Sequence, residues 1–408
     1  MYASVYAYPW DVQDETPAAF CASVREHLGA DTVTIAASYH AAKLILPHNP
    51  RRKVYYPDDG SLYFQPDPAA AWRDSPIAPH VGAATREADP LAALSQEAAR
   101  AGLGVIAWTV CLHNTRLGER YPQYAPRNAF GDPAITYLCP SQPAARTYVR
   151  CLAGDLARRY PLQSIQLEAA HHMPFVHGFH HEMQQLPVTP ALAILLGLCF
   201  CDACLTLASD AGLDGQAVRR YVAAEIERLL VDEGGEDDPS ARVEGYWADR
   251  LGGELGRYMA LRRTSVDALL REVYQAVEGK TQVFLQEASV VGSGDHTPVA
   301  DLAWQSGLAL PPAPNTADGV AILGYVAGLE RWTAEMGAYR AVLPAGLPVE
   351  VGLRPCIPDC ASAEELAAKV AYCATMGATG VSFYNYGMMP TRRMAWVRQA
   401  LEAARSAM

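Results

Sequence analysis

The chain has 408 residues, of which 33 are basic and 44 acidic, and its formal net charge is −11. Hydrophobic residues make up 50% of it and charged residues 19%, which excludes an intrinsically disordered chain and provides enough apolar material for a large core. The acidic balance argues against nucleic acids and anionic membranes as partners, because both bind basic surfaces.

The N-terminal segment lacks the basic region and the apolar region that together make a secretory signal peptide. The longest apolar stretch, residues 191–200, would cross only about half of a bilayer. Ten cysteines are too sparse in this chain for a disulfide scaffold. We therefore expect a soluble, cytoplasmic protein with reduced thiols.

Eight short runs of apolar, β-branched or aromatic residues recur along the chain. Continuous runs of this kind are typical of strands that are buried on both faces of a parallel sheet. We predict strands over residues 4–9, 32–39, 104–113, 164–168, 281–287, 320–325, 349–354 and 380–386.

Segments with helical patterns lie between these runs, and most begin with a recognisable N-cap. We predict helices over residues 18–27, 91–101, 143–159, 362–377 and 392–407, and two more over 215–232 and 240–277. Eight strands that alternate with helices predict a (β/α)8 TIM barrel, an α/β fold. The alternative is an open doubly wound sheet, but no glycine-rich phosphate turn follows the first strand.

One connection is much longer than the others. Residues 171–280 separate the fourth and fifth strands and contain a histidine-rich loop, a cysteine cluster and helices. We therefore predict a single barrel over 1–408, with 171–280 as an inserted helical subdomain that carries zinc. We place it on the C-terminal face of the barrel, where the active sites of such barrels lie.

The cysteine cluster consists of Cys199, Cys201 and Cys204, which form a Cys-x-Cys-x-x-Cys motif. Three thiolates at this spacing can surround one soft cation, and zinc prefers four ligands. Cys139 is the best candidate for the fourth, because it lies in the loop after the third strand on the same face. Four thiolates would make a closed, structural zinc site. The alternative is a group of buried thiols without metal, or a redox pair.

Part of the chain resembles a known family. The segment Cys139-Pro-Ser-Gln-Pro, the Ala-Arg-Arg-Tyr-Pro of residues 157–161, the strand end Ile-Gln-Leu-Glu168 and the Cys-x-Cys-x-x-Cys motif are similar to the β-galactosidases of glycoside hydrolase family 42. They are also similar to related glycosyl-hydrolase-like barrels. The resemblance covers residues 108–204. It implies zinc on the four cysteines, a carbohydrate substrate and a homo-oligomer, since oligomers are common in that family.

The catalytic motifs depart from family 42. That family ends its fourth strand in Asn-Glu and carries a nucleophilic Glu at the end of its seventh, whereas this chain has Leu167-Glu168 and Arg354 at these places. The resemblance to family 42 therefore does not imply that this chain has β-galactosidase activity. Glu350 and Asp11, together with Asp295, are reserve candidates for a catalytic carboxylate.

Glycoside hydrolysis needs two carboxyl groups across the scissile bond. Glu168 and Glu287 each end a predicted strand, the fourth and the fifth, so both are expected at the mouth of the barrel. We predict a glycosidase with Glu168 as nucleophile or general base and Glu287 as general acid, and with no organic cofactor. The alternative for either residue is a buried glutamate paired with an arginine such as Arg354.

Other predicted strand ends are rich in side chains that suit sugars. Aromatic faces stack on the C–H face of a pyranose ring, and His, Asn and Tyr supply hydrogen bonds. We predict substrate contacts from Tyr8, Trp10, Tyr39, His40, Trp108, His113, Asn114, His171, His172, Tyr325, Arg354, Tyr384 and Asn385.

The histidine-rich loop allows a second interpretation. It contains His171, His172, His177, His180 and His181, followed by Glu182, and two histidines with a carboxylate can bind a metal. The alternative functions are therefore a metal-dependent carbohydrate isomerase or lyase that uses this cluster, and a sugar-binding barrel without catalytic activity.

Overall fold

The computed structural model of the chain describes residues 1–69, 72–176, 182–287 and 299–406. Eight parallel strands form its centre, and the first pairs with both the second and the last, so the sheet closes into a barrel. The predicted (β/α)8 barrel is confirmed. Its strands are β1 (Tyr2–Ala7), β2 (Thr32–Tyr39), β7 (Gly104–Val110), β8 (Ser164–Glu168), β9 (Gln282–Glu287), β10 (Gly319–Leu323), β11 (Val349–Leu353) and β12 (Gly380–Phe383).

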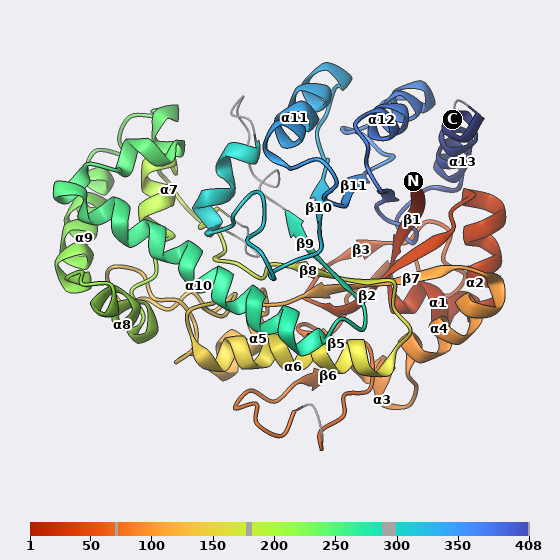
Figure 1. Ribbon diagram of the computed structural model, residues 1–408, viewed down its shortest axis with the longest axis horizontal. Helices are drawn as coiled ribbons and strands as arrows, with labels where there is room; N and C mark the ends of the chain where they lie inside the picture. The colour runs from red at the N-terminus through yellow and green to blue at the C-terminus, as the bar shows by residue number, and fades with distance from the viewer. Residues whose placement is uncertain (70–71, 177–181, 288–298, 407–408) are drawn as a thin grey trace.

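A ring of helices covers the outside of the barrel, and the two termini lie close together because β1 and β12 are neighbours (Figure 1). The helix that was predicted over residues 18–27 is α-helical only as far as Ser23, and the turn that follows it, Val24–Leu28, is π-helical. The ring contains α1 (Pro9–Glu15), α2 (Pro17–Ser23), α4 (Pro90–Ala101), α6 (Pro143–Arg159), α10 (Glu254–Val277), η5 (Val299–Ser306), α11 (Leu329–Val342), α12 (Ala363–Thr375) and α13 (Thr391–Ser406).

Smaller elements fill two of the loops at the ends of the strands. After β2 come β3 (Leu44–Ile45), β4 (Val54–Tyr55), β5 (Ser61–Leu62), β6 (His80–Val81) and α3 (Ala83–Arg86), and after β7 comes α5 (Thr115–Arg120). Strand β5 adds antiparallel to the end of β2. These elements therefore surround the C-terminal ends of β2 and β7.

The long connection after β8 forms a helical lobe, at the left of Figure 1. It contains α7 (Pro190–Leu196), α8 (Asp202–Asp210), α9 (Gly215–Val231), η2 (Pro239–Arg242), η3 (Glu244–Trp247) and η4 (Arg250–Gly253). The lobe has a hydrophobic cluster of its own, to which the start of α10 contributes Leu255 and Met259. The rest of α10 contributes Val266 and Val273 to the barrel's core and runs beside α6. Helix α10 therefore ties the lobe to the barrel.

None of the helices in the described part of the chain has both the length and the apolar character needed to cross a bilayer.

Candidate functional site

Glu168 ends strand β8 with its carboxylate turned toward the inside of the barrel mouth. Trp108 Nε1 donates a hydrogen bond to Oε2, and Gln286 Nε2 donates another to the same oxygen at 3.1 Å. Oε1 has no hydrogen-bond partner among the residues that the structure describes. One carboxylate oxygen is therefore fixed by the neighbouring strands, while the other remains for a ligand.

Burial raises the pKa of the Glu168 carboxyl above its usual range. The positive charge of His40 and the hydrogen bonds from Trp108 and Gln286 lower this pKa but do not cancel the effect of burial. A carboxyl that keeps its proton at higher pH than an ordinary glutamate is suited to general acid and base chemistry.

Aromatic side chains from several strand ends pack around Glu168. The Tyr39 and Trp108 ring centroids are 4.9 Å apart, and those of Trp108 and Tyr384 are 5.9 Å apart. Tyr8 stacks on Trp10 at 4.4 Å, and its hydroxyl lies 2.9 Å from that of Tyr384. The structure therefore brings together the predicted aromatic residues from the first, second, third and last strands.

Most of these rings pack on one another and form an aromatic wall at the barrel mouth. Tyr8, Trp10 and Trp108 are at most 2% exposed, so their faces pack on one another. Tyr325 and Tyr384 keep part of their surface, with ring centroids 5.6 Å apart. Among the predicted stacking residues, these two are the better placed to meet a sugar ring.

Two partly exposed histidines lie at the same mouth. The rings of His40 and His113 are 4.4 Å apart, and His40 also stacks on Tyr39. His40 Nδ1 lies 2.8 Å from the carbonyl oxygen of Ala41, so Nδ1 carries the proton and donates it. The other ring nitrogen of His40 is thereby fixed as an acceptor in the neutral imidazole.

Glu287 does not share this site with Glu168. Its carboxylate accepts a hydrogen bond from the Tyr339 hydroxyl of α11, and both side chains are completely buried. Gln286, one residue earlier, faces Glu168 inside the barrel, and successive residues of a strand point to opposite faces. Glu287 therefore faces the layer between β9 and α11, and the predicted catalytic pair is not formed across the mouth.

The reserve carboxylates are also placed differently from Glu168. Glu350 is completely buried lower in the barrel, where it accepts hydrogen bonds from Tyr2 and Gln166. Asp11 is buried at the start of α1 and accepts a hydrogen bond from the backbone N–H of Tyr8. Asp295 lies outside the described residues.

Two predicted contact residues have structural partners. Asn114 caps α5 by accepting the backbone N–H of Leu117, and its amide group donates to Gly60. Arg354 forms an ion pair with Asp359 and lies over the Tyr325 ring, 4.6 Å from its centroid. Their amide and guanidinium groups are therefore already engaged.

Asn385 differs from these residues. It is 2% exposed, its Oδ1 accepts the N–H of Gly387, and its Nδ2 has no partner among the described residues. This amide follows Tyr384 at the last strand end and keeps an unused donor.

Of the histidines after β8, His172 is directed to helix α10. His172 Nε2 lies 2.9 Å from Ser265 Oγ on α10, and His171 Nδ1 lies 3.0 Å from the His172 carbonyl oxygen. Burial lowers the pKa of His172 well below its usual range, so this ring is neutral at pH 7. His177, His180 and His181 lie outside the described residues, and Glu182 is exposed.

A cavity of about 690 Å³ adjoins the aromatic wall. Arg127, Asn128 and Tyr137 line it from the loop after β7, and Phe175 and Gln184 line it from the segment after β8. Tyr137 also belongs to the hydrophobic cluster that contains Trp108. The cavity is of the size of small-molecule sites, about 300–1,000 Å³.

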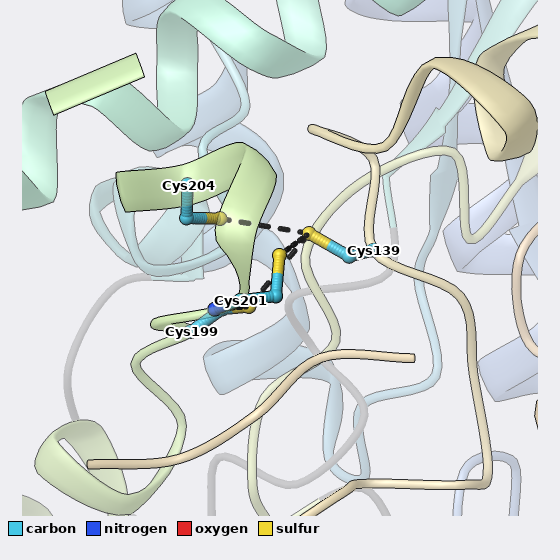
Figure 2. Close-up of side chains that lie close together, drawn as sticks. All are labelled: Cys139, Cys199, Cys201 and Cys204. Carbon is cyan, nitrogen blue, oxygen red and sulfur yellow. Dashed lines mark hydrogen bonds between the residues drawn. The ribbon is translucent and has the colours of Figure 1, made fainter. Parts of the chain in front are cut away.

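The four cysteines of the predicted metal site lie together, and all are buried. Figure 2 shows their sulfur atoms turned toward one another, with Cys139 facing the other three. The distances from Cys139 Sγ to the sulfurs of Cys204, Cys201 and Cys199 are 3.6, 3.7 and 3.8 Å. A disulfide would need about 2.05 Å, whereas a tetrahedral site with Zn–S bonds of about 2.3 Å separates its sulfurs by about 3.8 Å. The donor set and its spacing fit a four-coordinate soft cation.

Among the residues that the structure describes, this cluster is the only group of three or more His, Cys, Asp or Glu side chains with metal-ligand spacing. Burial raises the pKa of the Cys139 thiol well above its usual range, and a bound cation would hold this sulfur as a thiolate. The cluster also joins the loop after β7 to the start of α8.

Sequence reasoning missed two glutamines that face the barrel interior. Gln286 holds Glu168, and Gln166 connects Tyr6 with Glu350 through hydrogen bonds of 2.8 Å each. Gln166 could have been found from the sequence, because it is two residues before Glu168 and therefore lies on the same face of β8.

No family model matches the chain, and no curated protein matches it by sequence. The resemblance to family 42 therefore remains a prediction. Solved structures do match. The PgaB (BpsB) glycoside hydrolase domain from Bordetella bronchiseptica has a TM-score of 0.56 at 14% identity, covering 99% of this chain and 98% of that one.

Two further solved structures have similar scores. The catalytic domain of β-amylase from Paenibacillus polymyxa has a TM-score of 0.53 at 8% identity and covers 100% of this chain and 98% of that one. Alpha-L-fucosidase isoenzyme 2 from Paenibacillus thiaminolyticus has a TM-score of 0.54 at 13% identity and covers 99% of this chain but 49% of that one. The chain thus spans about half the length of that fucosidase. At such identities the likeness concerns the fold.

Proposed function

We propose that the protein hydrolyses a glycosidic bond at the barrel mouth, with Glu168 as the general acid and base. The observation that carries this proposal is the Glu168 carboxylate, which lies at the C-terminal end of a barrel strand with one oxygen held and the other without a protein partner. The solved structures with a similar fold include a glycoside hydrolase domain and a fucosidase, which supports a sugar as substrate.

The role of general acid follows from the environment of Glu168. Because burial raises its pKa, the carboxyl holds a proton that it can give to the leaving-group oxygen. When the bond to the leaving group has broken, water adds to the anomeric carbon of the glycosyl cation and gives its proton to the Glu168 carboxylate, which restores the acid. This assignment replaces the expected division of roles between Glu168 and Glu287, because the Glu287 carboxylate is bound to Tyr339 behind the barrel wall.

The neighbouring side chains suit a pyranose. Tyr325 and Tyr384 are partly exposed aromatic residues, and His40, His113 and the Asn385 amide offer hydrogen bonds. The adjoining cavity would hold the part of the substrate beyond the cleaved bond, with Tyr137 and Phe175 as apolar walls and Asn128 and Gln184 as polar ones.

The test is a panel of 4-nitrophenyl glycosides and matching disaccharides, cleaved by the wild type and by Glu168→Gln. Loss of a general acid costs about 10²–10⁴ in rate for a poor leaving group, and less for nitrophenolate, which needs no proton. We therefore expect Glu168→Gln to lose disaccharide cleavage and to keep more of its nitrophenyl activity. Near-wild-type cleavage of both substrates would refute the role of Glu168. Saturable sugar binding without any turnover by the wild type would favour a sugar-binding barrel instead.

We also propose that Cys139, Cys199, Cys201 and Cys204 hold a structural zinc ion. The four sulfurs fit a tetrahedral site, and their burial leaves no open position for a water or substrate ligand. Elemental analysis of protein purified without chelator should find about one zinc per chain, as expected for a closed site. A metal content near zero in folded protein would refute this.

A further inference from the structure

Arg262 is a buried arginine on α10 that lies beside the four-cysteine cluster. It is 8% exposed and shares a small cavity with Cys199 and Cys204. The cavity is also lined by Ser141, which follows Cys139 and Pro140 in the chain. Arg262 therefore lies on the barrel helix α10 next to the cysteine cluster.

No carboxylate neutralises this arginine within the described part of the chain. Its Nη2 donates to the carbonyl oxygen of Gly197 at 3.3 Å, and its Nε has no hydrogen-bond partner. The cysteines that line the same cavity are the nearest groups that could supply an anion. A buried charge is stable only when it is paired, and these thiols supply an anion only when they are ionised.

We propose that Arg262 is the counter-cation of a metal-bound tetrathiolate formed by Cys139, Cys199, Cys201 and Cys204, and that it strengthens the binding of a divalent metal there. This inference rests on the metal site proposed above. The four cysteines bind a divalent cation as thiolates, so the resulting centre carries two negative charges. Arg262 compensates one of them.

Polar hydrogens around the sulfurs support an anionic centre. The backbone N–H of Cys201 donates to Cys199 Sγ at 3.4 Å, and Gln142 Nε2 donates to Cys201 Sγ at 3.5 Å. Ser141 Oγ lies 3.3 Å from Cys204 Sγ, so its hydroxyl can donate once that thiol is ionised. Each such donor stabilises a thiolate more than a thiol.

The pairing predicts that removing the charge of Arg262 destabilises the metal-loaded protein. Arg262→Met leaves two negative charges uncompensated there and should lower the melting temperature.

The direct test is a competition titration of the reduced, metal-stripped full-length chain with zinc and a chromophoric chelator. Partners around a metal site typically contribute 10–100-fold to affinity, so we expect Arg262→Met to bind zinc about 10–100-fold more weakly. Arg262→Lys should keep most of the affinity. Arg263→Met is the matched control, because Arg263 is the next residue of α10, is exposed and pairs weakly with Asp267 at 3.9 Å.

Equal zinc affinity of Arg262→Met and Arg263→Met would overturn the inference. Arg262→Gln is the second neutral variant, since it keeps an N–H donor for Gly197. If Arg262→Met does not fold, equal zinc affinity of Arg262→Gln and Arg263→Met would overturn the inference. Absence of zinc binding by the wild type would instead refute the metal site itself.

Discussion

The hydrogen bond between Tyr339 and Glu287 allows a structural role of Glu287 to be separated from a catalytic one. Tyr339→Phe removes the phenolic oxygen and leaves the ring in place. Both residues are completely buried, so water cannot replace the lost donor. Leaving a buried partner without its hydrogen bond costs about 1–3 kcal/mol. We therefore expect the free energy of unfolding to fall by about 1–3 kcal/mol, with kcat unchanged.

The assay is urea unfolding followed by circular dichroism, with turnover measured on the same preparation. Tyr372→Phe is the matched control, because its half-buried hydroxyl has no hydrogen-bond partner among the described residues, and it should change stability by less than about 0.5 kcal/mol. Unchanged stability of Tyr339→Phe would contradict the structural role. A decrease in kcat by a factor of about 10² or more at unchanged stability would indicate a catalytic role for Glu287.

Three further predictions concern titration and metal. If Glu168 is the general acid, kcat/KM should fall as the pH rises through its pKa, which burial holds above 4.5, and a pH profile of Glu168→Gln that still shows this limb would contradict the assignment. Burial raises the pKa of Asp11 from 3.8 to about 8, so its contribution to stability is complete below pH 3.8 and is lost as the pH rises to about 8. Asp11→Asn should flatten this decline in urea unfolding measured at several pH values, and equal slopes would show that Asp11 is ionised in the folded protein. Cys204→Ser should reduce the metal content well below one per chain and lower the melting temperature, and full retention of metal would exclude Cys204 as a ligand.

The fold and the cysteine cluster were accessible from sequence because both depend on rules that are local or topological. Strands buried on both faces give continuous apolar runs, and these runs marked all eight barrel strands. Three of the cysteines lie within six residues, and Cys139 was placed near them because loops after adjacent parallel strands meet on one face.

Several predicted contact residues could not be judged in this way, because their partners are distant in sequence. Asn114 was predicted to contact a sugar, but its amide group is hydrogen-bonded to Gly60 and to the start of α5. His172 is close to Glu168 in the chain, but its partner is Ser265, which is 93 residues away on α10. A polar residue after a strand is therefore an ambiguous signal until the packing of the loop is known.

The choice between Glu168 and Glu287 shows a more general limit. In a half-buried strand, polar and apolar residues alternate and mark the two faces, but in a barrel strand both faces are buried and the alternation disappears. The strand end Gln286-Glu287 then gives no indication of which side chain points inward. The pairing of Leu167 with Leu285 decides it, because it places Gln286 beside Glu168 and sends Glu287 outward to Tyr339. A shift of one residue in the register of β9 would exchange the two, so the chemistry of the mouth depends on a tertiary register that this single sequence does not encode visibly.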